Sequence, residues 1–379
     1  MAFGRPWRWP ARIGLILGLL ILGWAGLGWF VFGVRLPPLQ WEPSSPPMAG
    51  EARDFHVDAD GAIFLGEEDG ALRFRAFVPE PMFLVQAKTA TTARIRVDNL
   101  HPECVDRGAE AVRIDGLRRD YEIAIKPGEG LMVRPQFPER ESYSFAALGD
   151  TGSGPELAAS LARAAELGAD FFLHLGDLHY KEIPLAEAAR AFDGASIPSY
   201  VAIGNHDFHR GLNFPWRDFQ ESIGPRNASF TLAGVDFVNL DTAANHYPAA
   251  SGERGELLDL LLVRPRPEDT LVVFTHRPLV DPRVPLGHIA PERDHALHHA
   301  SEVALLREVY LKLGADLVLN GHIHASYGTE VDGIPTWIVG NGLLLDEKGS
   351  EGVPQILIGT WSAADPGDLT WRTEPLSAP

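Results

Sequence analysis

The amino-acid sequence predicts a protein of the α/β class, in which a domain of strands and helices follows a small all-β domain and an N-terminal transmembrane helix. Three observations predict this order. Residues 13–34 contain no charged residue and no proline, residues 51–140 consist of short alternating runs, and residues 141–379 alternate apolar runs with helical patterns. The last arrangement is typical of a sheet built around parallel strands.

The start of the chain has the features of a membrane anchor. Residues 1–12 carry Arg5, Arg8 and Arg12 and no acidic residue, and the 22 residues 13–34 are long enough to cross the hydrocarbon core of a bilayer. A cleavable signal has a shorter apolar region and a cleavage site between small residues, so the sequence favours an uncleaved anchor. The positive-inside rule then keeps residues 1–12 in the cytoplasm and places everything after the span in the periplasm or the extracellular space.

Composition limits what the rest of the chain can bind. Residues 35–50 contain five prolines and two serines, which predicts a semi-rigid tether. The formal net charge of −18 argues against a nucleic-acid partner, because phosphate backbones repel an acidic surface. Cys104 is the only cysteine, which excludes an intrachain disulfide and a thiolate metal site. The oligomeric state does not follow from any of these features.

Residues 51–140 predict a small β-sandwich. Runs such as Ala71–Val78 and Ala93–Val97 alternate apolar and polar residues, as half-exposed strands do, and turn signals separate them. Nothing in this region has a catalytic pattern. His56 and His101 are isolated, and we expect both on the surface.

From Tyr143 onward, five apolar runs each end next to a residue type that binds metals. We interpret the runs as buried strands, and the segments Pro155–Leu167, Glu256–Leu262 and Ser301–Leu313 as helices between them. Ligands of open α/β sheets bind beyond the carboxyl ends of the strands, so we expect these residues to meet there. The five blocks are Gly149-Asp150 after Ser144–Leu148, Gly176-Asp177-Leu178-His179-Tyr180 after Phe171–Leu175, Gly204-Asn205-His206-Asp207 after Tyr200–Ile203, Thr275-His276 after Leu271–Phe274, and Gly321-His322-Ile323-His324 after Leu317–Asn320.

The donor atoms of these blocks suit a pair of metal ions. A set of oxygen and nitrogen donors without thiolates favours iron, manganese or zinc over calcium. Two such ions can hold a hydroxide between them and clamp the attacking and leaving oxygens of a phosphoryl transfer. The candidate ligands number seven if Asp177 serves both ions: Asp150, Asp177, Tyr180, Asn205, His276, His322 and His324.

The ordered set GD, GDxxY, GNHD, strand-end His and GHxH, spread over roughly residues 143–345, resembles the calcineurin-like metallophosphoesterase superfamily. It is most similar to the purple acid phosphatase branch. The resemblance implies a four-layer α/β/β/α sandwich. It also implies a ferric ion held by Asp150, Asp177, Tyr180 and His324, and a second metal held by Asp177, Asn205, His276 and His322. By the same resemblance His206 lies near the leaving group, as a proton donor or phosphate contact.

One substitution favours this branch over phosphodiesterase-like members. Those members usually carry a metal-binding histidine where this chain has Gly152, whereas Tyr180 supplies a phenolate where the purple branch has one. The exchange favours Fe(III) plus a divalent Fe, Zn or Mn over a colourless site with two manganese or two zinc ions. The alternative for Tyr180 is a phenol that merely packs beside the site.

Several other residues are weaker candidates. We expect His179, or one of His295, His298 and His299 in the loop 281–300, to contact the substrate, although the three loop histidines also fit a solvated segment ahead of a helix. Asp207 and Asp241 are interpreted as residues that orient histidines. Arg277 fits either a phosphate contact or a structural ion pair, and His174 lies inside a strand.

The sequence therefore predicts a membrane-anchored, extracytoplasmic, metal-dependent phosphatase. It would hydrolyse phosphate monoesters of small molecules by attack of a hydroxide bound to two metals, with His206 assisting the leaving oxygen. One alternative is a phosphodiesterase or pyrophosphatase on the same fold, which would differ in the width of the pocket. Another is a catalytically idle metal-binding surface protein, which Asn205 and His206 together disfavour. The natural substrate is beyond what the sequence predicts.

Overall fold

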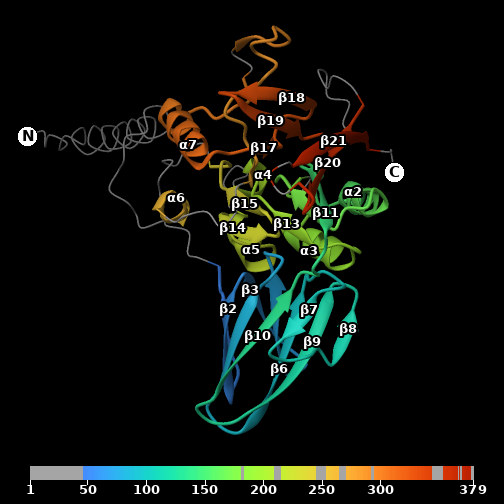
Figure 1. The fold of residues 1–379 in the computed structure, drawn as a ribbon, viewed down its shortest axis with the longest axis vertical. Helices are drawn as coiled ribbons and strands as arrows, with labels where there is room; N and C mark the ends of the chain where they lie inside the picture. The colour runs from blue at the N-terminus through green and yellow to red at the C-terminus, as the bar shows by residue number, and fades with distance from the viewer. Residues whose placement is uncertain are drawn as a thin grey trace, which may run out of the picture. The chain divides into compact units, whose positions relative to one another are not determined.

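The computed structural model describes residues 46–376, except for residues 181–182, 209–214, 245–252, 264–269, 292–293, 344–352, 366 and 368 (Figure 1). The predicted cytoplasmic segment 1–12, the span 13–34 and most of the tether 35–50 lie outside the described residues. None of the helices within the described ranges has the length and apolar character needed to cross a membrane.

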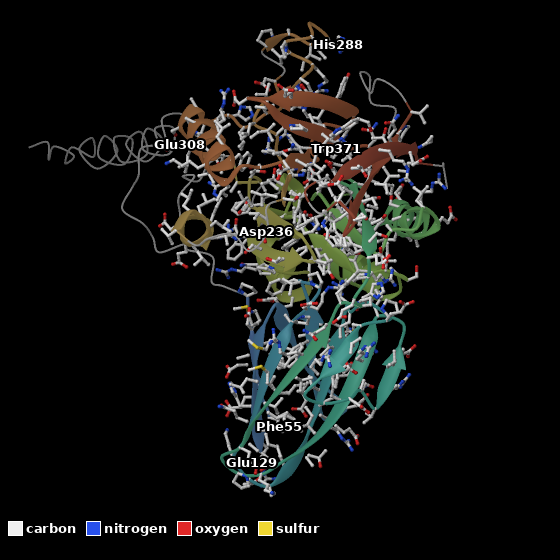
Figure 2. All side chains as sticks on the ribbon, viewed as in Figure 1. Phe55, Glu129, Asp236, His288, Glu308 and Trp371 are labelled. Carbon is white, nitrogen blue, oxygen red and sulfur yellow. The ribbon has the colours of Figure 1, made fainter. Side chains whose placement is uncertain are left out.

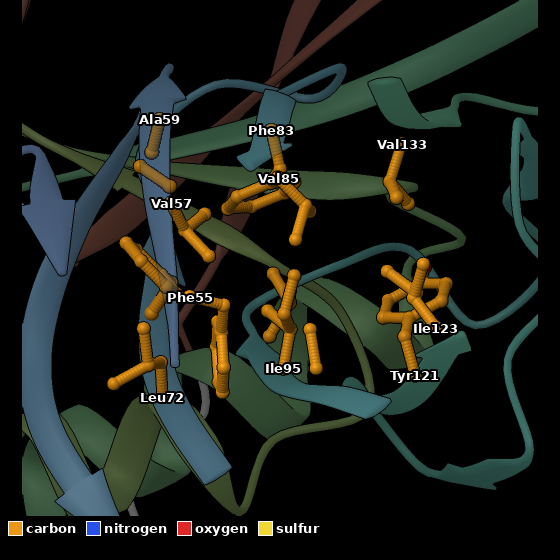
Figure 3. Close-up of a cluster of buried hydrophobic side chains, with 14 of the residues drawn as sticks. Phe55, Val57, Ala59, Leu72, Phe83, Val85, Ile95, Tyr121, Ile123 and Val133 are labelled. Carbon is orange, nitrogen blue, oxygen red and sulfur yellow. The ribbon is translucent and has the colours of Figure 1, made fainter. Parts of the chain in front are cut away.

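Two five-stranded sheets form the first part of the described chain. One has the order β1-β2-β5-β10-β7 and the other β3-β4-β6-β9-β8. Side chains that alternate along the strands, such as Ala93, Ile95 and Val97, point into a core shared by both sheets, as Figure 3 shows for Ile95. The strands are β1 (Ala49–Glu51), β2 (Phe55–Asp60), β3 (Ala62–Glu68), β4 (Ala71–Ala76), β5 (Met82–Ala87), β6 (Thr91–Asp98), β7 (Val105–Arg107), β8 (Arg113–Asp115), β9 (Arg118–Ile125) and β10 (Gly130–Gln136).

The expectation that His101 lies on the surface is wrong. Its side chain is buried, and its ring lies 4.8 Å from that of Phe137. Its Nδ1 accepts a hydrogen bond from the backbone N–H of Glu103. An isolated histidine in a sequence gives no sign of the aromatic partner that covers it.

Two further sheets follow from Ser142 onward. The first has the order β13-β12-β11-β20-β21 and the second β14-β15-β16-β17-β19-β18. The strands that precede the five candidate blocks pair in parallel within each sheet, so their carboxyl ends lie at one edge. The strands are β11 (Ser142–Leu148), β12 (Phe171–His174), β13 (Ser199–Val201), β14 (Ala228–Leu232), β15 (Val235–Leu240), β16 (Thr270–Thr275), β17 (Leu317–Asn320), β18 (Ser326–Val331), β19 (Ile334–Val339), β20 (Gln355–Ser362) and β21 (Thr370–Pro375).

Two side chains on opposite faces of β12 show how the layers are arranged. The Phe171 ring lies 5.6 Å from that of Phe237 in the second sheet, whereas His174 faces Phe192 of a helix at 6.1 Å. The two sheets thus pack face to face, and helices flank them on both outer sides (Figure 1). The helices are α2 (Pro155–Glu166), α3 (Leu185–Asp193), α4 (Asn205–Phe208), α5 (Trp216–Ser222), α6 (Glu253–Val263) and α7 (Ala300–Leu313). This mixed α/β arrangement is consistent with the predicted fold.

The predicted helices and strands that border the candidate blocks are present, with ends that shift by a residue or a few. The sequence reasoning missed α3 and α5, and it missed the hairpin of β20 and β21 near the end of the chain. Strand β20 is central to its sheet, where it pairs antiparallel with β11 along Ser142–Ala147. It therefore completes the sheet beside the strand that leads to Asp150.

Asn99 connects the first part of the chain to the strand that leads to Asn205. Its side-chain amide donates to the carbonyls of Ala76 and Ser199, at 2.7 and 2.8 Å, and its carbonyl accepts from the N–H of Ser199 at 2.9 Å. Asn99 is buried and has a φ of 67°, a conformation that asparagine tolerates better than most residues. The start of β13 is thereby fixed.

Candidate metal centre

Three site residues have a left-handed backbone. The φ angles are 60° for Asp150, 65° for Asp177 and 66° for His322, and each residue follows a glycine at a strand end. Such a conformation costs about 1–2 kcal/mol for a residue with a side chain, so the surrounding structure must impose it. The turns direct all three side chains back toward the edge of the sheets.

Two glycines make room for the carboxylates. A Cβ atom on Gly204 would lie 2.1 Å from Asp177 Oδ1, and one on Gly321 would lie 2.6 Å from Asp150 Oδ2. Both distances are shorter than any tolerable contact. Glycine is therefore required at these positions because the carboxylates lie too close to the backbone for any side chain, whatever the φ angle.

Four predicted ligands form a first group. Tyr180 OH lies 2.7 Å from Asp177 Oδ2, 3.4 Å from Asp150 Oδ1 and 3.2 Å from His324 Nε2. His324 Nε2 lies 3.5 Å from Asp150 Oδ1. Residues from three separate loops thus direct one donor atom each to a common point.

The other predicted ligands form a second group around the remaining oxygen of Asp177. His276 Nε2 lies 3.3 Å from Asp177 Oδ1 and 2.9 Å from Asn205 Oδ1. Ligand atoms of Asp177, His276 and His322 all lie within 4.8 Å of one another. The two carboxylate oxygens of Asp177 are thus divided between the two groups.

These spacings fit metal ions. Ligands bound at about 2.0–2.2 Å from one ion lie about 3 Å from their neighbours in octahedral geometry. His276 Nδ1 approaches the carbonyl oxygen of Leu175 at 2.8 Å, so it carries the proton and leaves the Nε2 lone pair for a ligand. Because Asn205 Oδ1 is also an acceptor, a positive charge, either a proton or a metal ion, has to lie between these two atoms.

The electrostatics of the first group also call for cations. Burial, together with the charge of Asp177, raises the pKa of Asp150, and burial beside both carboxylates raises the pKa of Tyr180. For Asp177 burial acts in the same upward direction, but the charges of His276, His206 and His322 outweigh it and hold its pKa well below the usual range. Without added positive charge the acidic groups cannot all ionise.

Of the predicted catalytic and substrate-contact residues, His206 and His295 lie beside the two groups. The His206 ring lies 4.5 Å from the Tyr180 ring, and its side chain is 40% exposed. His295 is exposed and its ring lies 5.8 Å from that of His322. Both imidazoles can therefore meet a ligand that approaches from solvent.

The loop that carries His295 is fastened by Asp281. This buried carboxylate accepts from the backbone N–H and side chain of Arg283, and from the N–H of His295 at 3.2 Å. Between these two anchors the loop runs out to His288, at its far end in Figure 2, and returns. The sequence reasoning singled out this loop but missed Asp281.

The remaining substrate candidates lie elsewhere or are oriented by other contacts. His179 is half-buried, and its N–H donates to Asp207. His298 and His299 are exposed, His299 is the N-cap residue of α7, and within the described ranges neither has a contact with the candidate ligands. His174 is buried inside its strand, where Nε2 lies 2.8 Å from Thr151 Oγ1.

The prediction that Asp207 and Asp241 orient histidines is wrong. Asp207 is buried and accepts hydrogen bonds from four backbone N–H groups, those of Asp177, Leu178, His179 and Gly204, at 2.7–2.9 Å. Asp241 pairs with Arg226 at 2.7 Å. Asp207 therefore holds the turn that presents the shared carboxylate of Asp177 and joins it to the Asn205 loop.

Sequence reasoning also missed the loop after β19. A Cβ on Gly340 would lie 2.9 Å from Asp150 Oδ2, and one on Gly342 would lie 2.4 Å from the carbonyl oxygen of Gly149. The signal was present as a Gly-x-Gly sequence at the end of a strand. Gly152, the position that distinguishes the branches, has a φ of 64°, and a Cβ there would lie 3.6 Å from the Tyr180 side chain. A larger residue at 152 would thus compete with Tyr180 for the same space.

We predict that Asp207→Asn destabilises the protein by about 1–3 kcal/mol and lowers its metal content, because the new amide would turn N–H donors toward backbone N–H donors. The measurements are thermal melting and the number of metal ions bound per chain. Asp115→Asn, which alters an exposed carboxylate, is the control and should change neither quantity. A normal melting temperature and metal content in Asp207→Asn would contradict the role of this carboxylate.

The chain is similar to known proteins that hydrolyse phosphoric esters. Residues 143–326 match the family model of the calcineurin-like phosphoesterases, and a search of curated proteins finds no match. Similar solved structures include a purple acid phosphatase from yellow lupin seeds, with 13% identity over 78% of this chain and 72% of that chain and a TM-score of 0.44. A dimetal phosphatase from Danio rerio has 12% identity over 62% of this chain and 99% of that chain, with a TM-score of 0.41. GAP50 of the Plasmodium inner membrane complex has 14% identity over 62% of this chain and 85% of that chain, with a TM-score of 0.46.

The family match covers the segment that carries all but the last strands of the two mixed sheets, and it includes every predicted metal ligand. The family depends on two metal ions, in agreement with the two groups of donor atoms. The predicted family is thus confirmed for residues 143–326, which carry a calcineurin-like phosphoesterase domain, and the match supports a hydrolase that acts on phosphoric esters.

Proposed function

We propose that this protein is a membrane-anchored, extracytoplasmic phosphatase that hydrolyses phosphate monoesters of small molecules with two metal ions. The observation that carries the proposal is the division of the Asp177 carboxylate. One oxygen lies 2.7 Å from Tyr180 OH and the other 3.3 Å from His276 Nε2, so a single side chain can hold two ions side by side. Two ions so placed would activate water and neutralise charge on the phosphoryl group.

The residues of the chain divide the remaining work. The buried ligands, Asp150 and Asp177 foremost, fix the two metal positions, since they are 0% and 1% exposed. His206 is placed by its own backbone, whose N–H donates to Asp177 Oδ1 at 2.9 Å, while its ring stays open to solvent. That position suits a general acid that gives a proton to the leaving oxygen.

We propose iron in the first group and a divalent Fe, Zn or Mn ion in the second. Tyr180 supports this choice, because its phenol oxygen lies among the donor atoms and does not merely pack beside them. A phenolate is a hard, anionic oxygen ligand that suits a trivalent ion. The absence of a side chain at Gly152 leaves this position to Tyr180.

The cellular location rests on the sequence of the N-terminus. Three arginines precede the uncharged span 13–34, and only Arg35 follows it closely. The positive-inside rule therefore favours a single span, with the catalytic domain outside the cytoplasm.

The first prediction of this proposal concerns the reaction. The full chain, supplied with iron, zinc and manganese, should hydrolyse an aryl phosphate monoester with a higher kcat/KM than the matching diester. Asp177→Asn should lose at least about a thousandfold of this activity and bind fewer metal ions, because both groups lose a carboxylate oxygen. Asp115→Asn is the matched control. Diester preference would overturn the monoester proposal, and unchanged metal content in Asp177→Asn would overturn the metal site.

The second prediction concerns the metal in the first group. A phenolate bound to ferric iron absorbs visible light, so the iron-loaded chain should be coloured and Tyr180→Phe should be colourless with iron still present. The measurement is an absorption spectrum taken together with iron analysis. A spectrum that Tyr180→Phe leaves intact would show that Tyr180 is no ligand.

The third prediction concerns the anchor. The full chain should remain in the membrane fraction after washing at alkaline pH, and deletion of residues 1–34 should release it. Protease added to intact cells or spheroplasts should reach the catalytic domain. Recovery of the full chain in the soluble fraction would contradict the anchor.

A further inference from the structure

Arg277 is a buried arginine at the end of β16, next to the candidate ligand His276. Its side chain is 9% exposed, and its backbone N–H donates to Thr242 Oγ1 at 2.7 Å. The guanidinium points to the second group of donor atoms, where Nη1 lies 2.7 Å from His322 Nε2. Its Nε has no hydrogen-bond partner among the residues that the structure describes.

Arg277 differs from the other buried arginines in the described part of the chain. Each of the other four has a carboxylate partner: Arg75 pairs with Asp193, Arg119 with Asp106, Arg226 with Asp241 and Arg254 with Glu302. Arg277 forms no ion pair in that part of the chain. A buried guanidinium without an anion is strongly unfavourable, so its partner is expected to come from outside the chain.

Asp177 and Asp150 influence the charge of Arg277 most among the carboxylates, but neither is its ion-pair partner. Burial lowers the pKa of Arg277 and the charges of Asp177 and Asp150 oppose that change, but both carboxylates face the two groups of donor atoms. The contact with His322 Nε2 uses the nitrogen that is itself a candidate ligand. If that nitrogen binds a metal, the N–H groups of Arg277 face the centre with no acceptor among the described residues.

We propose that Arg277 binds unesterified oxygens of the substrate's phosphoryl group and thereby favours phosphate monoesters over diesters. This inference rests on the proposed phosphatase function. A guanidinium presents several N–H donors in one plane and can hold two phosphate oxygens at once. A monoester offers three unesterified oxygens and up to two negative charges, whereas a diester offers two oxygens and one charge.

The surroundings of Arg277 support an anion at this place. His295 also lies beside His322, with a ring separation of 5.8 Å, and its backbone N–H donates to Asp281. His206 is exposed beside Tyr180. In a chain with a net charge of −18, three cationic or potentially cationic side chains beside the candidate ligands form a local exception that attracts phosphate.

The test uses the full chain loaded with metal, and inorganic phosphate as the probe. Arg277→Met should weaken phosphate binding by about 10- to 100-fold in isothermal titration calorimetry, with the metal content unchanged. Arg277→Lys should recover part of the affinity, because it keeps the charge and loses the planar pair of donors. Arg307→Met removes the same charge from an exposed ion pair with Asp332 and should leave phosphate binding as it is.

The preference for monoesters over diesters is a second measurement, and a general loss of structure would not change it. The ratio of kcat/KM for an aryl monoester to that for the matching diester should fall at least about tenfold in Arg277→Met. The proposal would be overturned if Arg277→Met left either the phosphate affinity or the monoester-to-diester ratio unchanged. It would also be overturned if Arg277→Met lost metal, because Arg277 would then serve to support His322. If Arg277→Met does not fold, the phosphate affinity, the monoester-to-diester ratio and the metal content are measured on Arg277→Lys instead, and the same outcomes overturn the proposal. Wild-type protein that neither binds metal nor hydrolyses either ester would instead refute the proposed function itself.

Discussion

The structure depends on several acidic side chains that lie close together at one edge of its sheets. Asp150 and Asp177 are almost completely buried, Tyr180 OH lies within 3.4 Å of both, and burial raises the pKa values of Asp150 and Tyr180. Buried carboxylates at such distances repel each other unless cations lie between them. Two metal ions satisfy that condition. Until they bind, the fold itself must hold the carboxylates in place.

The backbone around the centre supplies that force. Left-handed conformations at Asp150, Asp177 and His322 are unfavourable locally, and they persist because each turn directly follows a strand that is fixed in its sheet. Asp207 gathers four backbone N–H groups from two loops, so the turn at Asp177 cannot relax without breaking those bonds. Glycines at 204 and 321 then allow the carboxylates to approach the neighbouring backbone. The strain is thus distributed over the scaffold.

Sequence patterns predicted what depends on residue type and local order. Strands before the five blocks, the helices α2 and α7, and the meeting of the candidate ligands all follow from periodicity and from the rule for strand ends. What depends on distant partners was not predictable. His101 is covered by Phe137, Asp207 bonds to backbone groups that carry no sequence signal, and β20 joins the sheet from more than 200 residues away along the chain. The lack of an ion-pair partner for Arg277 in the described part of the chain belongs to the same class, because it is defined by what lies around the side chain in space.

Burial separates the candidate metal ligands from the candidate substrate contacts. His276 is fully buried and fixed by Leu175, whereas His206 and His295 keep their rings open to solvent. Arg277 lies between these two classes, since it is buried like a ligand yet carries a charge that a metal would repel. A cation beside metal ions is stable only if an anion lies among them. The substrate phosphate is the anion that such a centre handles, so the position of Arg277 is best explained by a site that is complete only when phosphate is bound.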